Sequence, residues 1–285
     1  MVEYRFLQLD PRSKEQTEIF MGIEVTIPNV EITSGINLDH HGKDDTAETP
    51  AACEQALQAE LPPEDATIAT VRTDQDSITA MAVIANRAIG RKVDELVVRA
   101  VGLMDRYGPK VEEQLRHDLV VAIARKAADF KVPLDQRVAF VQACLDGTYN
   151  PEEIALLVEA RNREFEGSRK ASQVKTAAGG RIAVVVSTHR FATNLGYEVA
   201  PVVVATNPSM PVIGESGKTV GETYLKHTVC RWDSNVPVDL EGALKEFQSI
   251  EPGWGGRGDI FGSPQGVSSK LTTEQVVGMV EKYLH

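Results

Sequence analysis

Ile36-Asn37-Leu38-Asp39-His40-His41-Gly42 runs from an apolar strand directly into an acid, two adjacent histidines and a glycine. Three side chains that can bind a metal therefore leave one strand end together, and a strand end holds ligands more rigidly than a loop does. Imidazole and carboxylate are ligands that manganese, iron and zinc ions accept. The alternative is a turn that happens to carry polar residues, because a triplet of this kind is a short pattern.

The composition is that of an ordinary globular protein of 285 residues, with 42% hydrophobic and 25% charged residues. This length favours two domains over one. The net charge of -11 argues against a protein that grips long duplex nucleic acid. Three widely spaced cysteines fit a reducing compartment. The sequence shows neither a signal peptide nor an apolar run of membrane-spanning length, so it predicts a cytoplasmic protein without membrane contact.

Further acids stand at predicted element ends in the first third of the chain. The alternation ahead of Asp10 predicts a strand that ends at this residue. Asp74 and Asp76 stand where a helix begins. Ligands gather beyond the C-terminal ends of strands in open α/β sheets, so we expect these acids to share one crevice with the 36–42 stretch. Alternatively, Asp74 only caps the helix that follows it.

The middle of the chain is helical by pattern. Residues 93–106 predict an amphipathic helix that ends near Asp105. An acid there is usually solvated, although it lies unfavourably at the negative end of the helix dipole, which makes a hidden partner worth considering. Residues 111–170 are almost wholly helical and are expected to pack and connect.

A composition shift at Lys170–Gly180 marks the expected domain boundary. Beyond it, strand patterns alternate with helical ones, and a glycine-rich segment from Gly253 to Gly266 separates the last two helices. Backbone without side chains can approach an anion closely, and Arg231 and Arg257 supply positive charge, which favours an anion-binding loop over a flexible surface loop. The sequence thus predicts an α/β protein with a parallel-sheet N-terminal domain, a helical connector and a smaller C-terminal α/β domain. Their expected ranges are 1–110, 111–170 and 171–285.

Taken together, these motifs resemble the DHH phosphoesterase superfamily with its C-terminal DHH-associated domain, the group of RecJ-type exonucleases and nano-RNases. The resemblance covers most of the chain. It rests on Leu38-Asp39-His40-His41-Gly42 as the name-giving motif, on Leu9-Asp10 as an upstream aspartate motif and on Thr73-Asp74-Gln75-Asp76-Ser77 as a later one. In the C-terminal half it rests on Val229-Cys230-Arg231-Trp232-Asp233 and on the glycines from Gly255-Gly256 through Gly262.

Two features depart from the family pattern. Members normally carry a motif of the type H-x-x-x-x-D-x-D ahead of the position of Asp10, and none stands there in this sequence. The segment from Asp74 to Ala82 itself resembles that first motif and could supply its ligands from a rearranged position. Arg257 stands where the glycine-rich loop usually carries a histidine, which suits an anion but not proton transfer.

The resemblance implies a hydrolase that cleaves a phosphoester of a small nucleotide or short single-stranded oligonucleotide with a metal-activated water. The implied cofactor is one or two divalent ions, manganese or else magnesium. The implied metal ligands are Asp10, Asp39, His40, Asp74 and Asp76, with Asp39 and His41 in catalysis. The implied substrate-binding residues are Arg231, Gly255, Gly256, Arg257 and Gly262. Two other functions stay open, a pyrophosphatase or polyphosphatase and a non-catalytic descendant that binds a nucleotide or a protein, and so does a homodimer.

Overall fold

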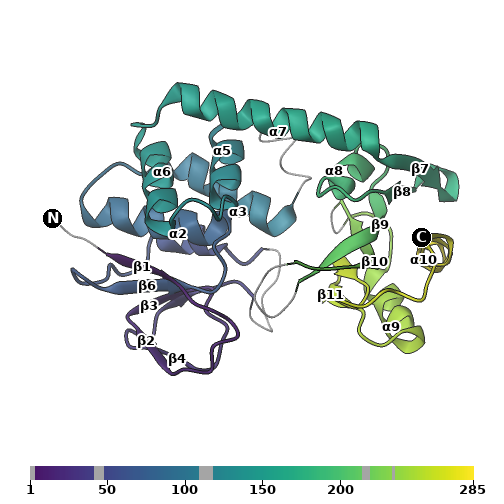
Figure 1. Ribbon diagram of the computed structural model, residues 1–285, viewed down its shortest axis with the longest axis horizontal. Coiled ribbons are helices and arrows are strands. Elements are labelled where there is room, and N and C mark those ends of the chain that lie inside the picture. The colour runs from purple at the N-terminus through teal and green to yellow at the C-terminus, as the bar shows by residue number, and fades with distance from the viewer. Residues whose placement is uncertain (1–3, 42–47, 109–117, 214–218, 233–234) are drawn as a thin grey trace. The chain divides into compact units, whose positions relative to one another are not determined.

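Figure 1 shows the computed structural model of the chain, which describes residues 4–41, 48–108, 118–213, 219–232 and 235–285. Gly42 and Asp233 of the quoted motifs lie outside these residues. The chain divides into two compact units, Met1–Asn162 and Arg163–His285, which we call unit 1 and unit 2. The division falls inside helix α7 (Pro151–Ala171), whereas the segment predicted as the boundary ends this helix and continues as strand β7 (Gln173–Ala177).

A four-stranded parallel sheet lies at the centre of unit 1, with the strand order β1-β6-β3-β5. Because neighbouring strands run parallel, their C-terminal ends meet at one edge. β2 and β4 pair in a second, two-stranded parallel sheet. The strands are β1 (Arg5–Gln8), β2 (Thr17–Ile19), β3 (Met21–Ile23), β4 (Val30–Ile32), β5 (Asn37–Leu38) and β6 (Thr67–Thr70).

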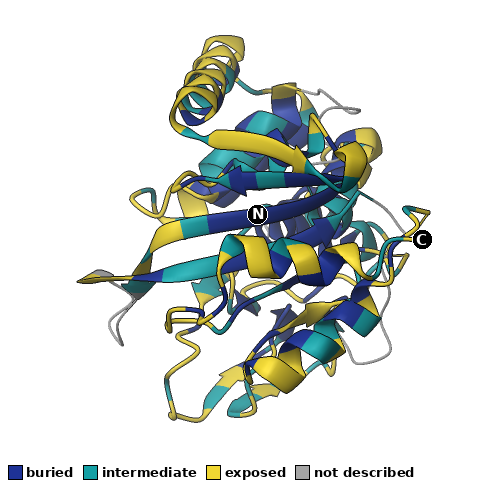
Figure 2. Cartoon of the chain, turned by 90° about the vertical axis from the view of Figure 1, so that its right-hand side faces the viewer, coloured by how far each residue is buried: buried dark blue, intermediate teal, exposed yellow. Residues whose placement is uncertain are grey.

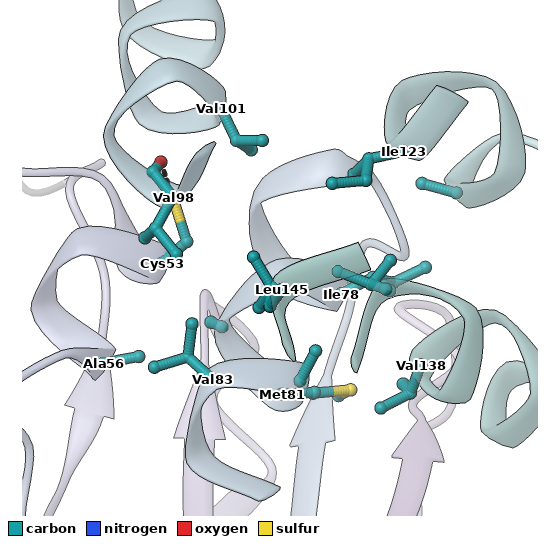
Figure 3. Packing of buried hydrophobic residues seen from close by; sticks show 14 of the residues in the cluster. Cys53, Ala56, Ile78, Met81, Val83, Val98, Val101, Ile123, Val138 and Leu145 are labelled. Atoms are coloured by element: carbon teal, nitrogen blue, oxygen red, sulfur yellow. Dashed lines mark hydrogen bonds between the residues drawn. The ribbon is translucent and has the colours of Figure 1, made fainter. Parts of the chain in front are cut away.

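Helices cover one face of the four-stranded sheet (Figure 1). Their buried sides share one apolar core with the sheet, and Met81 and Leu145 lie at its centre in Figure 3. Helices predicted as a connector contribute Ile123 and Val138 to this core, so they stabilise the parallel sheet directly. The helices are α1 (Ala52–Ala56), α2 (Gln75–Ala88), α3 (Glu95–Tyr107), α5 (Asp118–Ala127) and α6 (Leu134–Asp146).

Helix α2 is the central helix of unit 1. Every residue from Asp76 to Asn86 is buried, which explains why its sequence is apolar and small on all sides rather than on one stripe. It packs on both α1 and α6. A helix enclosed in this way is a rigid platform, and its first turn lies at the edge where the strands end.

A six-stranded mixed sheet forms the centre of unit 2, in the order β11-β12-β10-β9-β8-β7. Helix α8 packs on one face, and α9 and α10 pack on the other around Phe247 and Trp254. Figure 2 shows buried residues gathered along the central strands of this sheet. The elements are β8 (Ile182–Val186), α8 (Ala192–Tyr197), β9 (Val202–Ile213), β10 (Thr219–Arg231), α9 (Leu240–Ile250), β11 (Gly255–Arg257), β12 (Ile260–Gly262) and α10 (Thr273–Glu281), with the short 3-10 turn η1 (Ala178–Gly180) after β7.

The predicted fold class is confirmed: a parallel-sheet unit, a helical segment and an α/β unit with a mixed sheet follow one another. The predicted glycine-rich loop is instead the hairpin β11–β12. Gly256 has a packing reason, because a Cβ at this position would lie 2.3 Å from the Ile260 carbonyl oxygen. Across the described residues, we find no helix that is both long enough and apolar enough to span a membrane.

Candidate metal centre

Three neighbouring parallel strands deliver the candidate site. Glu24 follows β3, His40 follows β5, and Asp76 lies in the first turn of α2, which follows β6. Asp105, from the last turn of α3, reaches the same place. The carboxyl edge of the sheet is thus where these four side chains converge, as expected for an open α/β sheet.

Potential ligand atoms of Glu24, His40, Asp76 and Asp105 all lie within 4.8 Å of one another. The Nε2 atom of His40 lies 3.1 Å from Oδ2 of Asp105, 3.3 Å from Oε1 of Glu24 and 3.6 Å from Oδ2 of Asp76. Only 1% of the His40 side chain is exposed, yet neither ring nitrogen has a partner in hydrogen-bond geometry among the described residues. Buried polar atoms are normally bonded, so a ring nitrogen that faces three carboxylates without a directed bond fits a place for a cation.

The backbone of Glu24 is strained. Its φ of 52 lies in the left-handed region, which a residue with a Cβ adopts at a cost of about 1–2 kcal/mol, and the residue is only 3% exposed. The hydrogen bond from its N–H to the Leu38 carbonyl keeps it paired to β5. This conformation turns an acid at the end of an apolar strand toward His40.

Asn37 holds the chain just beyond Glu24. Its Oδ1 accepts from the Val25 N–H at 3.1 Å, and its Nδ2 donates to the Val25 carbonyl at 3.0 Å. Gly22 makes room for this side chain, since a Cβ there would lie 2.5 Å from Asn37 Oδ1. The neighbouring strand thus stabilises the strained turn.

Asp76 is fixed by backbone donors. Its Oδ2 and Oδ1 accept from the N–H groups of Ala52 and Cys53, each at 2.8 Å, at the start of α1. A carboxylate oxygen has two acceptor positions, so each oxygen keeps one for another partner. Asp76 can therefore cap α1 and contribute to the cluster together.

The close packing of acidic groups shifts the pKa values of the residues in and beside the cluster. Asp105 first and Glu24 second raise the pKa of His40 to about 10, against the opposing effect of burial. Burial, followed by repulsion from Glu24, raises the pKa of Asp76 to about 7 and that of Asp74 to about 6. Carboxyls that resist ionisation in the folded protein gain when a divalent ion binds among them, because the ion supplies the missing positive charge.

Asp74 supports the site from its border. It caps α2, with its Oδ1 3.0 Å from both the N–H and the hydroxyl of Ser77. The same hydroxyl lies 2.8 Å from Oε2 of Glu24. The Ser77 hydroxyl has one proton and can donate it to only one of these two carboxylates at a time. The contact with the other carboxylate is favourable only when the two acids share a proton or when one of them is neutral. Ser77 therefore links Asp74 to Glu24.

His41 lies on the solvent side, where 35% of its side chain is exposed. Its Nδ1 lies 3.0 Å from Oδ1 of Asp39 and 3.3 Å from Oε1 of Glu24. With the Nδ1 proton donated to Asp39, the Nε2 atom keeps its lone pair. Glu24, His40 and His41 form a second group of close ligand atoms.

The structure therefore brings together His40 and Asp76 of the predicted ligands and adds Asp105 and Glu24. Asp39 and Asp74 lie outside both groups of close ligand atoms: Asp39 contacts His41, and Asp74 is linked to Glu24 through the Ser77 hydroxyl. Asp10 belongs to neither group. It follows β1, which lies at the edge of the sheet. Its carboxylate closes a turn there by accepting from the Arg12 N–H at 2.9 Å. Sequence reasoning missed Glu24, whose one signal was an acid inside an otherwise apolar run.

The predicted substrate residues lie in unit 2. Arg231 ends β10, where Nη1 donates to the Val238 carbonyl at 3.2 Å and the buried Nε has no partner among the described residues. Arg257 lies 3.6 Å from Asp259 across the hairpin turn. Gly255 pairs with Gly262 in the β11–β12 ladder, so this backbone is engaged in strand pairing.

Comparison of the chain with models of known protein families and with curated proteins gives no match in either case.

Proposed function

We propose that unit 1 binds a divalent metal ion through Glu24, His40, Asp76 and Asp105 and hydrolyses a phosphoester of a small nucleotide or short oligonucleotide. The buried His40 ring nitrogen, surrounded by three carboxylates without a directed hydrogen bond, carries this proposal. The strained Glu24 backbone supports it, because strain of this kind persists where the surroundings enforce it, often at functional sites.

We propose manganese as the bound ion, with magnesium as the second choice. The donor set has three carboxylates and one imidazole, and it contains no thiolate, since the nearby Cys53 donates toward the Val98 carbonyl instead (Figure 3). Imidazole suits borderline ions, whereas carboxylates alone suit magnesium. Such an ion lowers the pKa of water and neutralises phosphoryl oxygens when bound.

His41 and Asp39 would act beside the metal ligands. Asp39 would orient the His41 ring through Nδ1, and 35% of the His41 side chain is exposed to solvent. The Nε2 lone pair of His41 would first take up a proton, which His41 would then donate to the leaving oxygen. Gln55 fixes this turn, because its Nε2 donates to the Asp39 carbonyl at 2.8 Å. The roles of Arg231, Arg257 and the three glycines in binding substrate remain predictions.

The position of Asp76 also bears on the resemblance to the DHH superfamily. The segment from Asp74 to Ala82 resembles the first motif of that family, displaced along the chain. Its second aspartate contacts His40, as a displaced ligand motif requires. We therefore favour a hydrolase with rearranged motifs over a non-catalytic descendant.

Metal analysis and two assays test the proposal. We expect the purified protein to bind manganese and to hydrolyse bis(p-nitrophenyl) phosphate only with metal. Pyrophosphate as the sole substrate would favour the pyrophosphatase alternative. The variant His40→Asn should lose both metal and activity, while Glu18→Gln, an exposed acid on β2, should keep both. Metal binding without hydrolysis of either substrate would reject the hydrolase proposal and support a non-catalytic binding protein.

A further inference from the structure

Unit 2 contains a cavity of about 270 Å³ beyond the end of β8. Its walls are the turn at 187–193, the middle of β9, and Lys226 with Thr228 on β10. Ligand pockets are usually upwards of about 300 Å³, so this one suits a small group. It shares no residue with the metal centre or with the predicted substrate residues.

The lining is cationic and rich in hydroxyl groups. In a chain with a net charge of -11, none of its residues is an aspartate or glutamate. Its cationic or titratable residues are His189, Arg190 and Lys226, and its hydroxyl residues are Ser187, Thr188, Thr193, Thr206 and Thr228. This set of donors excludes a metal ion and favours an anion.

Lys226 carries a charge that is paired with no acid among the described residues. Its side chain is half-buried, its Nζ donates to the Ser263 carbonyl, and the part of the chain that the structure describes offers it no carboxylate. Arg190 differs, because it is paired with Glu164 at 2.7 Å. Burial of a charge is costly unless the charge is paired, so a bound anion would stabilise Lys226.

Some hydroxyl groups of the pocket lining make hydrogen bonds within the protein, and others can bind a ligand. Ser187 Oγ accepts from the His189 N–H at 3.0 Å, and Thr206 Oγ1 lies 2.9 Å from His227 Nδ1, so both serve the fold. The hydroxyls of Thr193 and Thr228 make no hydrogen bond to any residue that the structure describes. These two groups can donate to a ligand beside Lys226.

We propose that this pocket binds a small molecule through a phosphate group, with Lys226 as counter-charge and Thr193 and Thr228 as donors. A phosphate presents more acceptor oxygens than a carboxylate, which suits a lining with this many donors. The site needs neither a metal nor bond cleavage. It therefore goes beyond the hydrolysis proposed for unit 1 and can be tested without it.

The test is a titration of ¹⁵N-labelled full-length protein with inorganic phosphate, without metal and at constant ionic strength. We expect saturable shifts of the amide signals from residues 187–193. Lys226→Met should weaken the affinity by at least about tenfold. Lys245→Met, on the exposed side of α9, is the matched control and should bind as the unaltered protein does.

Because Lys226 also bonds to Ser263 in the hairpin, Thr228→Val provides a second variant that leaves this contact intact. It should weaken binding about threefold or more. A protein without saturable shifts, or two variants that bind phosphate normally, would overturn the proposal. If acetate bound as tightly as phosphate, the pocket would be a carboxylate site, and this result would also reject the proposal.

Discussion

Gly22 and Asn37 pack so closely that a Cβ on Gly22 would lie 2.5 Å from Asn37 Oδ1. Asn37 in turn bonds both backbone groups of Val25, the residue after Glu24. A glycine on β3 therefore helps to fix the backbone next to Glu24, an acid of the candidate metal centre.

Gly22→Ala should lower metal affinity without removing a ligand. The new methyl group displaces Asn37 and frees the turn at Glu24, and losses of outer contacts typically cost about 10–100-fold in affinity. Isothermal titration with manganese measures the change. Gly278→Ala, in α10 where a Cβ meets nothing within 4 Å, is the control for the substitution itself. Equal affinities in both variants would contradict a positioning role.

Asp105→Asn and Asp10→Asn should show which acid binds the metal, Asp105 of the observed cluster or Asp10 of the predicted ligand set. Asp105 Oδ2 lies 3.1 Å from His40 Nε2, whereas the Asp10 carboxylate accepts from the Arg12 N–H within its own turn. We expect more than about a tenfold loss of manganese affinity for Asp105→Asn and none for Asp10→Asn. A loss with Asp10→Asn alone would show that the upstream aspartate motif supplies the ligand.

Glu24→Gln should weaken manganese binding and lower the pKa of His40. The amide keeps the shape of the side chain and can accept from the Ser77 hydroxyl, while the charge that raises the pKa values of His40, Asp74 and Asp76 disappears. We expect more than about a tenfold loss of manganese affinity, which isothermal titration measures. An unchanged affinity would show that Glu24 is not a ligand.

The stability of the metal-free protein should fall as pH rises. In the folded state the pKa of His40 is about 10 against 6.5, and that of Asp76 about 7 against 3.8. The folded state therefore holds more protons than the unfolded state between these values, and the free energy of unfolding decreases with pH. Thermal unfolding in chelator should show a falling Tm, and His40→Asn should lose the part of the fall above neutral pH.

Manganese affinity should change in the opposite direction. Metal binding displaces protons from His40 and from the carboxyls, so affinity should increase with pH over the same range. Isothermal titration in buffers of different ionisation enthalpy counts the protons released. Binding with no proton release would place the ion away from His40 and Asp76.

Phe247→Ala should destabilise unit 2. Phe247 is fully buried and stacks on Trp254 at 4.3 Å between ring centroids. Loss of a buried aromatic ring typically costs about 3–5 kcal/mol, which chemical unfolding measures. Ile250→Ala, in the same helix but 53% exposed, should change stability by less than about 0.5 kcal/mol.

Local sequence patterns were sufficient to predict the fold class and two of the four residues of the proposed site. The apolar runs of β8 and β9 and the periodic helices α9 and α10 were predicted because each is recognisable from its own residues. The hairpin β11–β12 was predicted as a loop, although at least Gly256 is required by its close contacts with Ile260 and Phe261 across the strand pair. Strand β7 was missed, since its five residues are mostly exposed and carry no apolar alternation.

The sequence by itself determined that His40 leaves a strand end beside other polar groups and that Asp76 begins an apolar helix. Only the tertiary structure decided which acids accompany them. Parallel pairing of β3 between β5 and β6 places Glu24 in the cluster, and the packing of α3 adds Asp105. Register and backbone strain at Glu24 depend on contacts between strands, which no local pattern records.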